Sequence, residues 1–124
     1  MKLFLEATNV IDLQISNEEI DNIFEYEPNI IDNRTFSIHF IFAHSHKDGI
    51  SIKVKYQAIF KTEDDIDNSL LDNPFLHVNA PAIAYPFLRA YIANILLMSG
   101  YDPLMLPSIN FDAEWKKRNH IQSK

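Results

Sequence analysis

Apolar and polar residues alternate along two neighbouring stretches in the first half of the chain. In the first stretch, the apolar residues at every second position are Phe36, Ile38, Phe40 and Phe42. In the second, they are Ile50, Ile52, Val54, Tyr56, Ala58 and Phe60. Alternation with a period of two is typical of antiparallel strands that bury one face and expose the other. Asp48-Gly49 lies between the stretches and can adopt a positive φ cheaply, so we predict a β-hairpin.

Two further segments upstream carry strand signals. The alternation from Leu3 to Ile15 predicts one long strand, with a bulge near Thr8-Asn9 where the pattern changes phase. Ser16-Asn17 can then cap a short turn over residues 18–22. Residues 23–35 are predicted to be an extended crossing segment or a further strand that Pro28 ends.

The second half of the chain carries helical signals. After an acidic connection over residues 63–73, the most regular helical stretch runs from Pro86 to Ser99, and Gly100 suits the position after its end. Asp112 is predicted to cap a short last helix over residues 113–121. Strands followed by helices indicate the α+β class, and the length fits a single domain over residues 1–124.

The predicted long helix is apolar on almost every side. Between Phe87 and Met98 only Arg89 and Asn94 are polar, and they lie about 140° apart around the helix axis. One face can pack on the sheet, but a small domain has little second layer to cover the rest. Exposed apolar patches usually mark association surfaces, so we expect a homo-oligomer. The alternative is a helix that its own domain covers.

Composition excludes several classes. The chain has no cysteine, and its net charge of −6 argues against binding of nucleic acid, which requires a basic surface. The first residues do not form a secretory signal, and the longest apolar run, over residues 90–98, is too short to span a bilayer. We therefore expect a cytoplasmic protein without membrane insertion.

Signatures of catalysis and of metal binding are weak. With only Gly49 and Gly100, the chain cannot form a glycine-rich phosphate loop, and no nucleophile motif is present. His44 and His46 have a spacing that could chelate a metal, but the sequence suggests no third ligand nearby, so a solvated turn is the preferred interpretation. We predict no enzyme activity, no cofactor and no metal site.

Apolar residues gather instead in segments predicted to be irregular or terminal. They are Phe24, Tyr26, Tyr101, Leu104, Met105, Leu106, Ile109, Phe111 and Trp115. Pro103 and Pro107 stiffen the part between the two helices, which suits a groove for extended apolar peptides. The alternative is that these side chains close the edge of the core.

Two motifs in the second half resemble the signature of the SecB family of protein-export chaperones. In that family, a helix that begins Phe-Pro-(Tyr/Phe)-x-Arg is followed by a loop that ends Leu-x-Pro-x-Asn-Phe-Asp-Ala. The matching stretches here are Tyr85-Pro86-Phe87-Leu88-Arg89 and Leu106-Pro107-Ser108-Ile109-Asn110-Phe111-Asp112-Ala113. The resemblance is strongest over residues 78–115 and extends to the hairpin and the first strand.

The resemblance implies a four-stranded antiparallel sheet followed by a long and a short helix. It also implies dimers formed through edge strands, tetramers formed through the long helices, and an ATP-independent holdase that binds unfolded polypeptides. The family's substrate groove maps onto Phe24, Tyr26, Leu104, Leu106, Ile109, Phe111 and Trp115.

The sequence departs from export chaperones of this family at the positions that meet the SecA motor. Asp12 matches one acidic partner-binding position, but the companion glutamate falls on Ser16 and the tail is basic. Delivery to SecA therefore stays open, and so does a role as a SecB-like chaperone of a toxin–antitoxin system. A small-ligand or protein-interaction module on the same fold is the alternative from another class.

Overall fold

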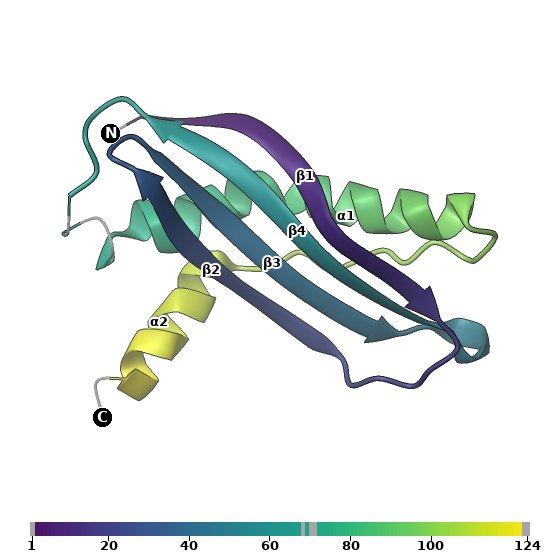
Figure 1. Ribbon diagram of the computed structural model, residues 1–124. Coiled ribbons are helices and arrows are strands. Elements are labelled where there is room, and N and C mark those ends of the chain that lie inside the picture. The colour runs from purple at the N-terminus through teal and green to yellow at the C-terminus, as the bar shows by residue number, and fades with distance from the viewer. Residues whose placement is uncertain (1, 68, 70–71, 123–124) are drawn as a thin grey trace.

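Four strands precede two helices in the computed structural model, which describes residues 2–67, 69 and 72–122. The strands are β1 (Leu3–Ser16), β2 (Ile23–Asp32), β3 (Thr35–Ser45) and β4 (Ser51–Thr62), and the helices are α1 (Ala80–Met98) and α2 (Phe111–Gln122). The strands form one antiparallel sheet in the order β1-β4-β3-β2 (Figure 1). The predicted α+β class is confirmed, as is the sheet followed by a long and a short helix.

The predicted β3–β4 hairpin is present, with its turn at the predicted place. Phe40 lies opposite Tyr56 and Phe36 opposite Phe60, and Gly49 has a φ of 75° in a 3-10 turn over Lys47–Gly49. The prediction of a wetter opposite face holds only in part, because Ser37 is fully buried there. Its side chain is short and lies on a central strand, so longer neighbours cover it.

β1 is one long strand, as predicted, but the predicted position of its bulge is wrong. The register against β4 shifts twice, between Leu5 and Ala7 and between Val10 and Asp12, rather than at Thr8-Asn9. Each shift adds one residue to the alternation. The half-buried positions of β1 are therefore Leu3, Leu5, Thr8, Val10, Leu13 and Ile15.

β2 continues through Pro28, which was predicted to end it. Pro28 lies opposite Ile38 of β3, and β2 is the outermost strand on that side of the sheet. A proline is tolerated in an edge strand because its missing N–H faces outward, where no ladder partner exists. The linker between β1 and β2 bends at Asn17 and Glu18 and is otherwise irregular, and the Glu18 amide donates to Ser16 Oγ at 3.3 Å.

Both helices begin earlier than predicted. α1 follows a π-helical turn, Phe75–Asn79, and Pro81 occupies its first turn, so Pro86 lies inside the helix. α2 begins at Phe111 and is capped by Asn110, whose Oδ1 accepts from the Ala113 amide at 3.0 Å. The predicted cap, Asp112, lies in the first turn, where it pairs with Lys116 at 2.9 Å. Gly100, with a φ of 92°, follows the end of α1 as predicted.

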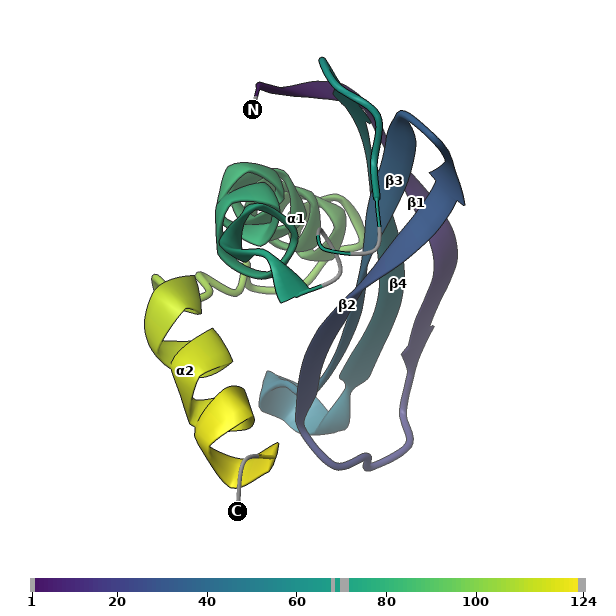
Figure 2. The same ribbon diagram turned by 90° about the vertical axis from the view of Figure 1, so that its left-hand side faces the viewer.

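α1 lies across one face of the sheet, and none of the helices in the described part of the chain covers the other face (Figure 2). The fully buried residues of α1 include Pro81 and a stripe of residues four positions apart, Ala80, Ala84, Leu88, Ile92 and Leu96. By length and composition, Leu76–Met98 could cross a membrane, but the core helix of a soluble protein meets the same criterion. The segment 99–110 then runs back along α1 to α2 (Figure 1).

Candidate binding site

Four aromatic rings from β2, α1 and α2 meet beside the end of the segment 99–110. The ring of Tyr85 lies 5.7 Å from Phe24 and 5.5 Å from Phe111, centroid to centroid. Tyr26 packs edge-on against Phe111 at 5.1 Å. Edge-to-face pairs at such distances are favourable beyond the area they bury. This aromatic cluster (Phe24, Tyr26, Tyr85 and Phe111) therefore joins the three elements into one wall.

Tyr85 also holds the segment between the helices in place. Its hydroxyl donates to the Pro107 carbonyl at 2.7 Å, and burial raises the pKa of this phenol, so it stays a donor at neutral pH. Burial likewise raises the pKa of Tyr26, whose hydroxyl has no hydrogen-bond partner among the residues that the structure describes.

The structure places the seven predicted substrate-binding residues at different depths. Tyr26, Leu106 and Phe111 are only 5%, 7% and 3% exposed and belong to the core. The other four are half-buried, Phe24, Leu104, Ile109 and Trp115, and the first three of these pack against the core. The first set therefore forms the wall of any surface groove, and only the second set could touch a bound chain without rearrangement.

Trp115 lies apart from the aromatic cluster. It stacks on His77 of the π-helical turn, with 5.5 Å between ring centroids and 8° between ring planes. Trp115 therefore docks the middle of α2 on the segment that leads into α1.

The most exposed apolar side chain of the segment is Met105, which is one of the apolar residues named from the sequence but is not among those onto which the family's groove maps. Met105 is 74% exposed and lines a hollow of about 240 Å³ with Pro86, Arg89, Ala90, Ala93 and Leu106. The exposure of Met105 could have been predicted from the sequence, because neighbouring side chains of an extended segment point to opposite sides. Leu104 and Leu106 turn toward the core, so Met105 turns outward.

A second exposed apolar surface lies on α1, on the side away from the sheet. Its large residues, the exposed α1 stripe, are Ile83, Phe87, Leu97 and Met98. Met98 is 81% exposed, whereas Tyr91 and Ile95 are half-buried against the core. Nothing in the described chain covers this stripe.

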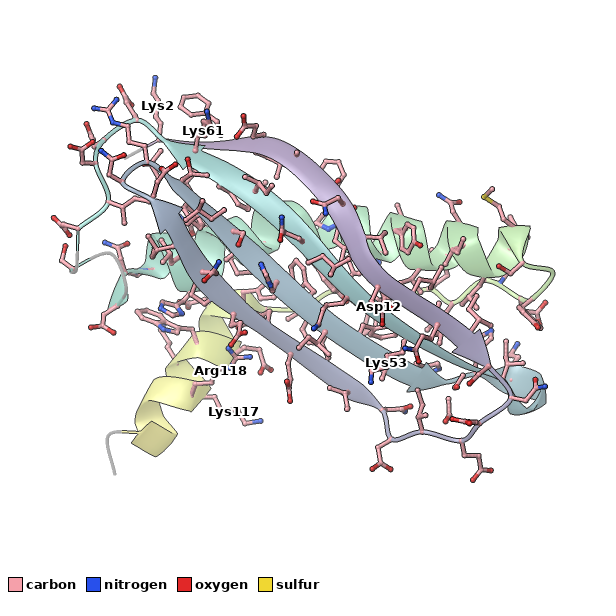
Figure 3. All side chains as sticks on the ribbon, viewed as in Figure 1. Lys2, Asp12, Lys53, Lys61, Lys117 and Arg118 are labelled. Carbon is pink, nitrogen blue, oxygen red and sulfur yellow. The ribbon has the colours of Figure 1, made fainter. Side chains whose placement is uncertain are left out.

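Asp12 lies on β1, the edge strand on the opposite side of the sheet from β2. Its neighbour in the register is Lys55, and Gln14 Nε2 donates to Asp12 Oδ2 at 3.3 Å. In Figure 3 Asp12 and Lys53 lie over the same part of the sheet. The surroundings of Asp12 therefore carry both charges, rather than a purely acidic surface.

The two turn histidines have structural partners. His46 Nε2 lies 2.7 Å from the Asp102 carbonyl oxygen, and His44 stacks on Phe42. Burial, and then the nearby His46, lowers the pKa of His44. Among the described residues, no three histidine, cysteine or carboxylate side chains are grouped so that they could hold a metal ion.

Comparison with known proteins places this fold. The family model described as preprotein translocase subunit SecB matches residues 7–122. Protein-export protein SecB of Anaplasma phagocytophilum is 35% identical over 68 residues, which are 53% of this chain and 42% of that protein. That of a Wolbachia species is 33% identical over 79 residues, 61% of this chain and 47% of that protein. The matches thus span less than half of these curated relatives.

A solved structure shows the same fold. It is a Mycobacterium tuberculosis SecB-like chaperone in complex with a ChAD peptide from the HigA1 antitoxin, at a TM-score of 0.66 and 15% identity. The likeness covers 86% of this chain and 89% of that one. Because the family model spans nearly the whole chain, the chain belongs to the SecB family.

Proposed function

We propose that the protein is an ATP-independent holdase, which binds unfolded or extended polypeptides and keeps them from aggregating. The observation that carries the proposal is the segment Leu104–Ile109. It is held between the two helices by the Tyr85 hydroxyl and presents Met105, 74% exposed, over a hollow of about 240 Å³. Because the chain belongs to a family of chaperones, we interpret this apolar surface as the surface that binds clients.

The chemistry of the surface suits varied clients. Methionine is flexible and polarisable, so it adapts to apolar side chains of different shapes. The half-buried Phe24, Leu104, Ile109 and Trp115 would extend the contact, while the buried Tyr26, Leu106 and Phe111 would support it from below. With only two glycines, the chain cannot form a glycine-rich loop that binds phosphate, so we expect client binding and release to need no nucleotide.

We further propose that the protein is a cytoplasmic homo-oligomer, a dimer of dimers that covers the exposed α1 stripe. The stripe contains Phe87 at 48% and Leu97 at 60% exposure, and apolar surface of this kind is usually buried by association.

Protein export and service to a toxin–antitoxin pair are the two candidate cellular roles. The curated relatives are protein-export proteins, which favours export. Delivery to SecA through Asp12 is the less supported part, because Lys55 lies beside that carboxylate. The structure of the Mycobacterium tuberculosis chaperone that shares the fold contains an antitoxin peptide, and this supports the role in a toxin–antitoxin system. A small-ligand or protein-interaction module would instead show one tight, stoichiometric partner.

The decisive experiment is suppression of aggregation. A chemically denatured test protein is diluted into buffer with and without this protein, and light scattering is followed with and without ATP. We expect scattering to fall with rising protein concentration, equally in both conditions, and Trp115 fluorescence to shift when the unfolded protein is added. Undiminished scattering at excess protein would overturn the proposal, and a strict requirement for ATP would overturn its ATP-independence.

A further inference from the structure

The turn of the β3–β4 hairpin holds the beginning of the segment 99–110. His46 Nε2 lies 2.7 Å from the Asp102 carbonyl oxygen, and Lys47 Nζ lies 3.5 Å from Asp102 Oδ2. The hairpin turn and the end of α1, from which the segment starts, lie at the same end of the molecule (Figure 1). The contact therefore ties the sheet to a residue that is 56 positions away in the sequence.

Of these two contacts, the one from His46 is the stronger constraint. A carbonyl oxygen can only accept a hydrogen bond, so the hydrogen must be on Nε2 and His46 must be the donor. The Lys47–Asp102 pair lies at the surface, with side chains 70% and 68% exposed. Exposed ion pairs contribute little because water screens them and two long side chains must be ordered.

The other end of the segment is held in the same way. The Tyr85 hydroxyl donates to the Pro107 carbonyl oxygen at 2.7 Å. Pro103 and Pro107 have no N–H, so the segment is poorly suited to join the sheet as a strand. Its carbonyl oxygens remain available, and at each end one of them accepts a hydrogen bond from a side chain of a regular element or its turn.

The side chains between the two anchors alternate in exposure. Leu104 is half-buried, Met105 is 74% exposed and Leu106 is 7% exposed. Successive side chains of an extended chain point to opposite sides, so a slip of one residue would exchange the inward and outward sets. One fixed carbonyl at each end therefore determines that Met105 faces outward.

We propose that His46 is a positioning residue for client binding, because its hydrogen bond to Asp102 keeps the segment in the register that presents Met105. The proposal rests on the proposed holdase function and adds a residue that acts through the segment without touching the client. Without His46, only the Pro107 end would be held, and the residues before it would be free to twist. Met105 would then spend less time in its outward position over the hollow beside α1.

The first test compares substitutions in the turn. His46→Ala removes the donor, so binding of a labelled, permanently unfolded test protein should weaken about 2- to 10-fold in fluorescence anisotropy. His46→Gln places an amide N–H near the position of Nε2 and should restore binding. Lys47→Ala should leave binding nearly unchanged, because it removes only an exposed ion pair. His46→Asn, whose amide is too short to reach Asp102, replaces His46→Ala if that variant does not fold.

A double-mutant cycle tests whether His46 acts through Met105. His46→Ala is made both in the unchanged protein and in the Met105→Ser variant, and binding is measured in each. If His46 positions Met105, the loss of binding caused by His46→Ala should disappear in the Met105→Ser background. A loss of the same size in both backgrounds would overturn the proposal, because a merely structural role weakens binding equally in both.

Nitrogen NMR of the imidazole ring supplies a readout that does not depend on clients. At mildly alkaline pH, the His46 ring should carry its hydrogen on Nε2 and none on Nδ1. A neutral ring with its hydrogen on Nδ1 would overturn the hydrogen bond on which the proposal rests.

The outcomes separate this inference from the holdase proposal. If the unchanged protein binds the unfolded test protein but folded His46→Ala binds it equally well, the positioning role is overturned while the holdase proposal stands. The same conclusion follows if His46→Gln does not restore binding. If the unchanged protein does not bind the unfolded test protein, both proposals are overturned.

Discussion

Substitution of Met105 and Leu106 should separate client binding from stability at adjacent positions. Fully burying a methionine side chain contributes about 1.5–3 kcal/mol. Met105 is 74% exposed, so a client can add roughly three quarters of that burial, about 1–2 kcal/mol. Met105→Ser should therefore weaken binding of an unfolded polypeptide about 5- to 30-fold. The free energy of unfolding of the Met105→Ser variant should differ from that of the unchanged protein by less than about 0.5 kcal/mol, because Met105 lies on the surface.

Leu106 should behave in the opposite way. It is 7% exposed, so Leu106→Ala leaves a cavity in the core and should lower the free energy of unfolding by about 2–5 kcal/mol. Stability is measured by urea unfolding and binding by anisotropy of a labelled, permanently unfolded test protein. Ile31→Ser, at an exposed position of β2, is the control that should change neither quantity. Unchanged binding by Met105→Ser would refute the placement of the client surface.

Three further substitutions test the assembly, the cap of α2 and the turn histidine. Phe87→Glu should reduce the mass measured by light scattering from that of four chains to that of two, twice 14.4 kDa, with an unchanged circular dichroism spectrum; an intact tetramer would contradict the proposed interface. Asn110→Ala should cost about 1 kcal/mol, seen in urea unfolding, because the cap of α2 is lost. The pKa of His44 is lowered by folding, so the unfolded chain binds more protons and stability falls as pH drops below about 6.5. His44→Gln should reduce this acid loss; an identical pH profile would contradict it.

The strands of the hairpin could be predicted from the sequence because the alternation that identifies a strand lies within the strand itself. Alternation of apolar residues within β3 and β4 identifies both strands without knowledge of their neighbours. The bulges of β1 were misplaced because a bulge is defined by register against β4, which the residues of β1 alone do not reveal. The prediction that Pro28 ends its strand was wrong for a related reason. A proline ends a central strand but is tolerated in an edge strand, and the sequence alone does not show that β2 lies at an edge.

The candidate site was predicted as a set of residues, but their depths were not. Leu104, Met105 and Leu106 are all apolar and adjacent, and only packing against α1 and β2 decides that Leu106 is buried while Met105 is exposed. In the sequence, Arg118 stands out only as part of a basic tail. Its contact with Tyr26 joins residues that are 92 positions apart, and no pattern in the sequence links them.

The rigidity of the wall behind the candidate site has a consequence for binding. Tyr85 contacts Phe24, Phe111 and the Pro107 carbonyl, so one side chain joins β2, α2 and the segment between the helices. A surface that is already ordered loses little conformational entropy when a client binds, and ordering costs fall mainly on the client. Flexibility is then needed only at the contacting side chains, and the exposed methionine supplies it. Broad client recognition and a well-packed domain are therefore compatible in one small chain, because the adaptable part is a side chain and the framework is an aromatic cluster.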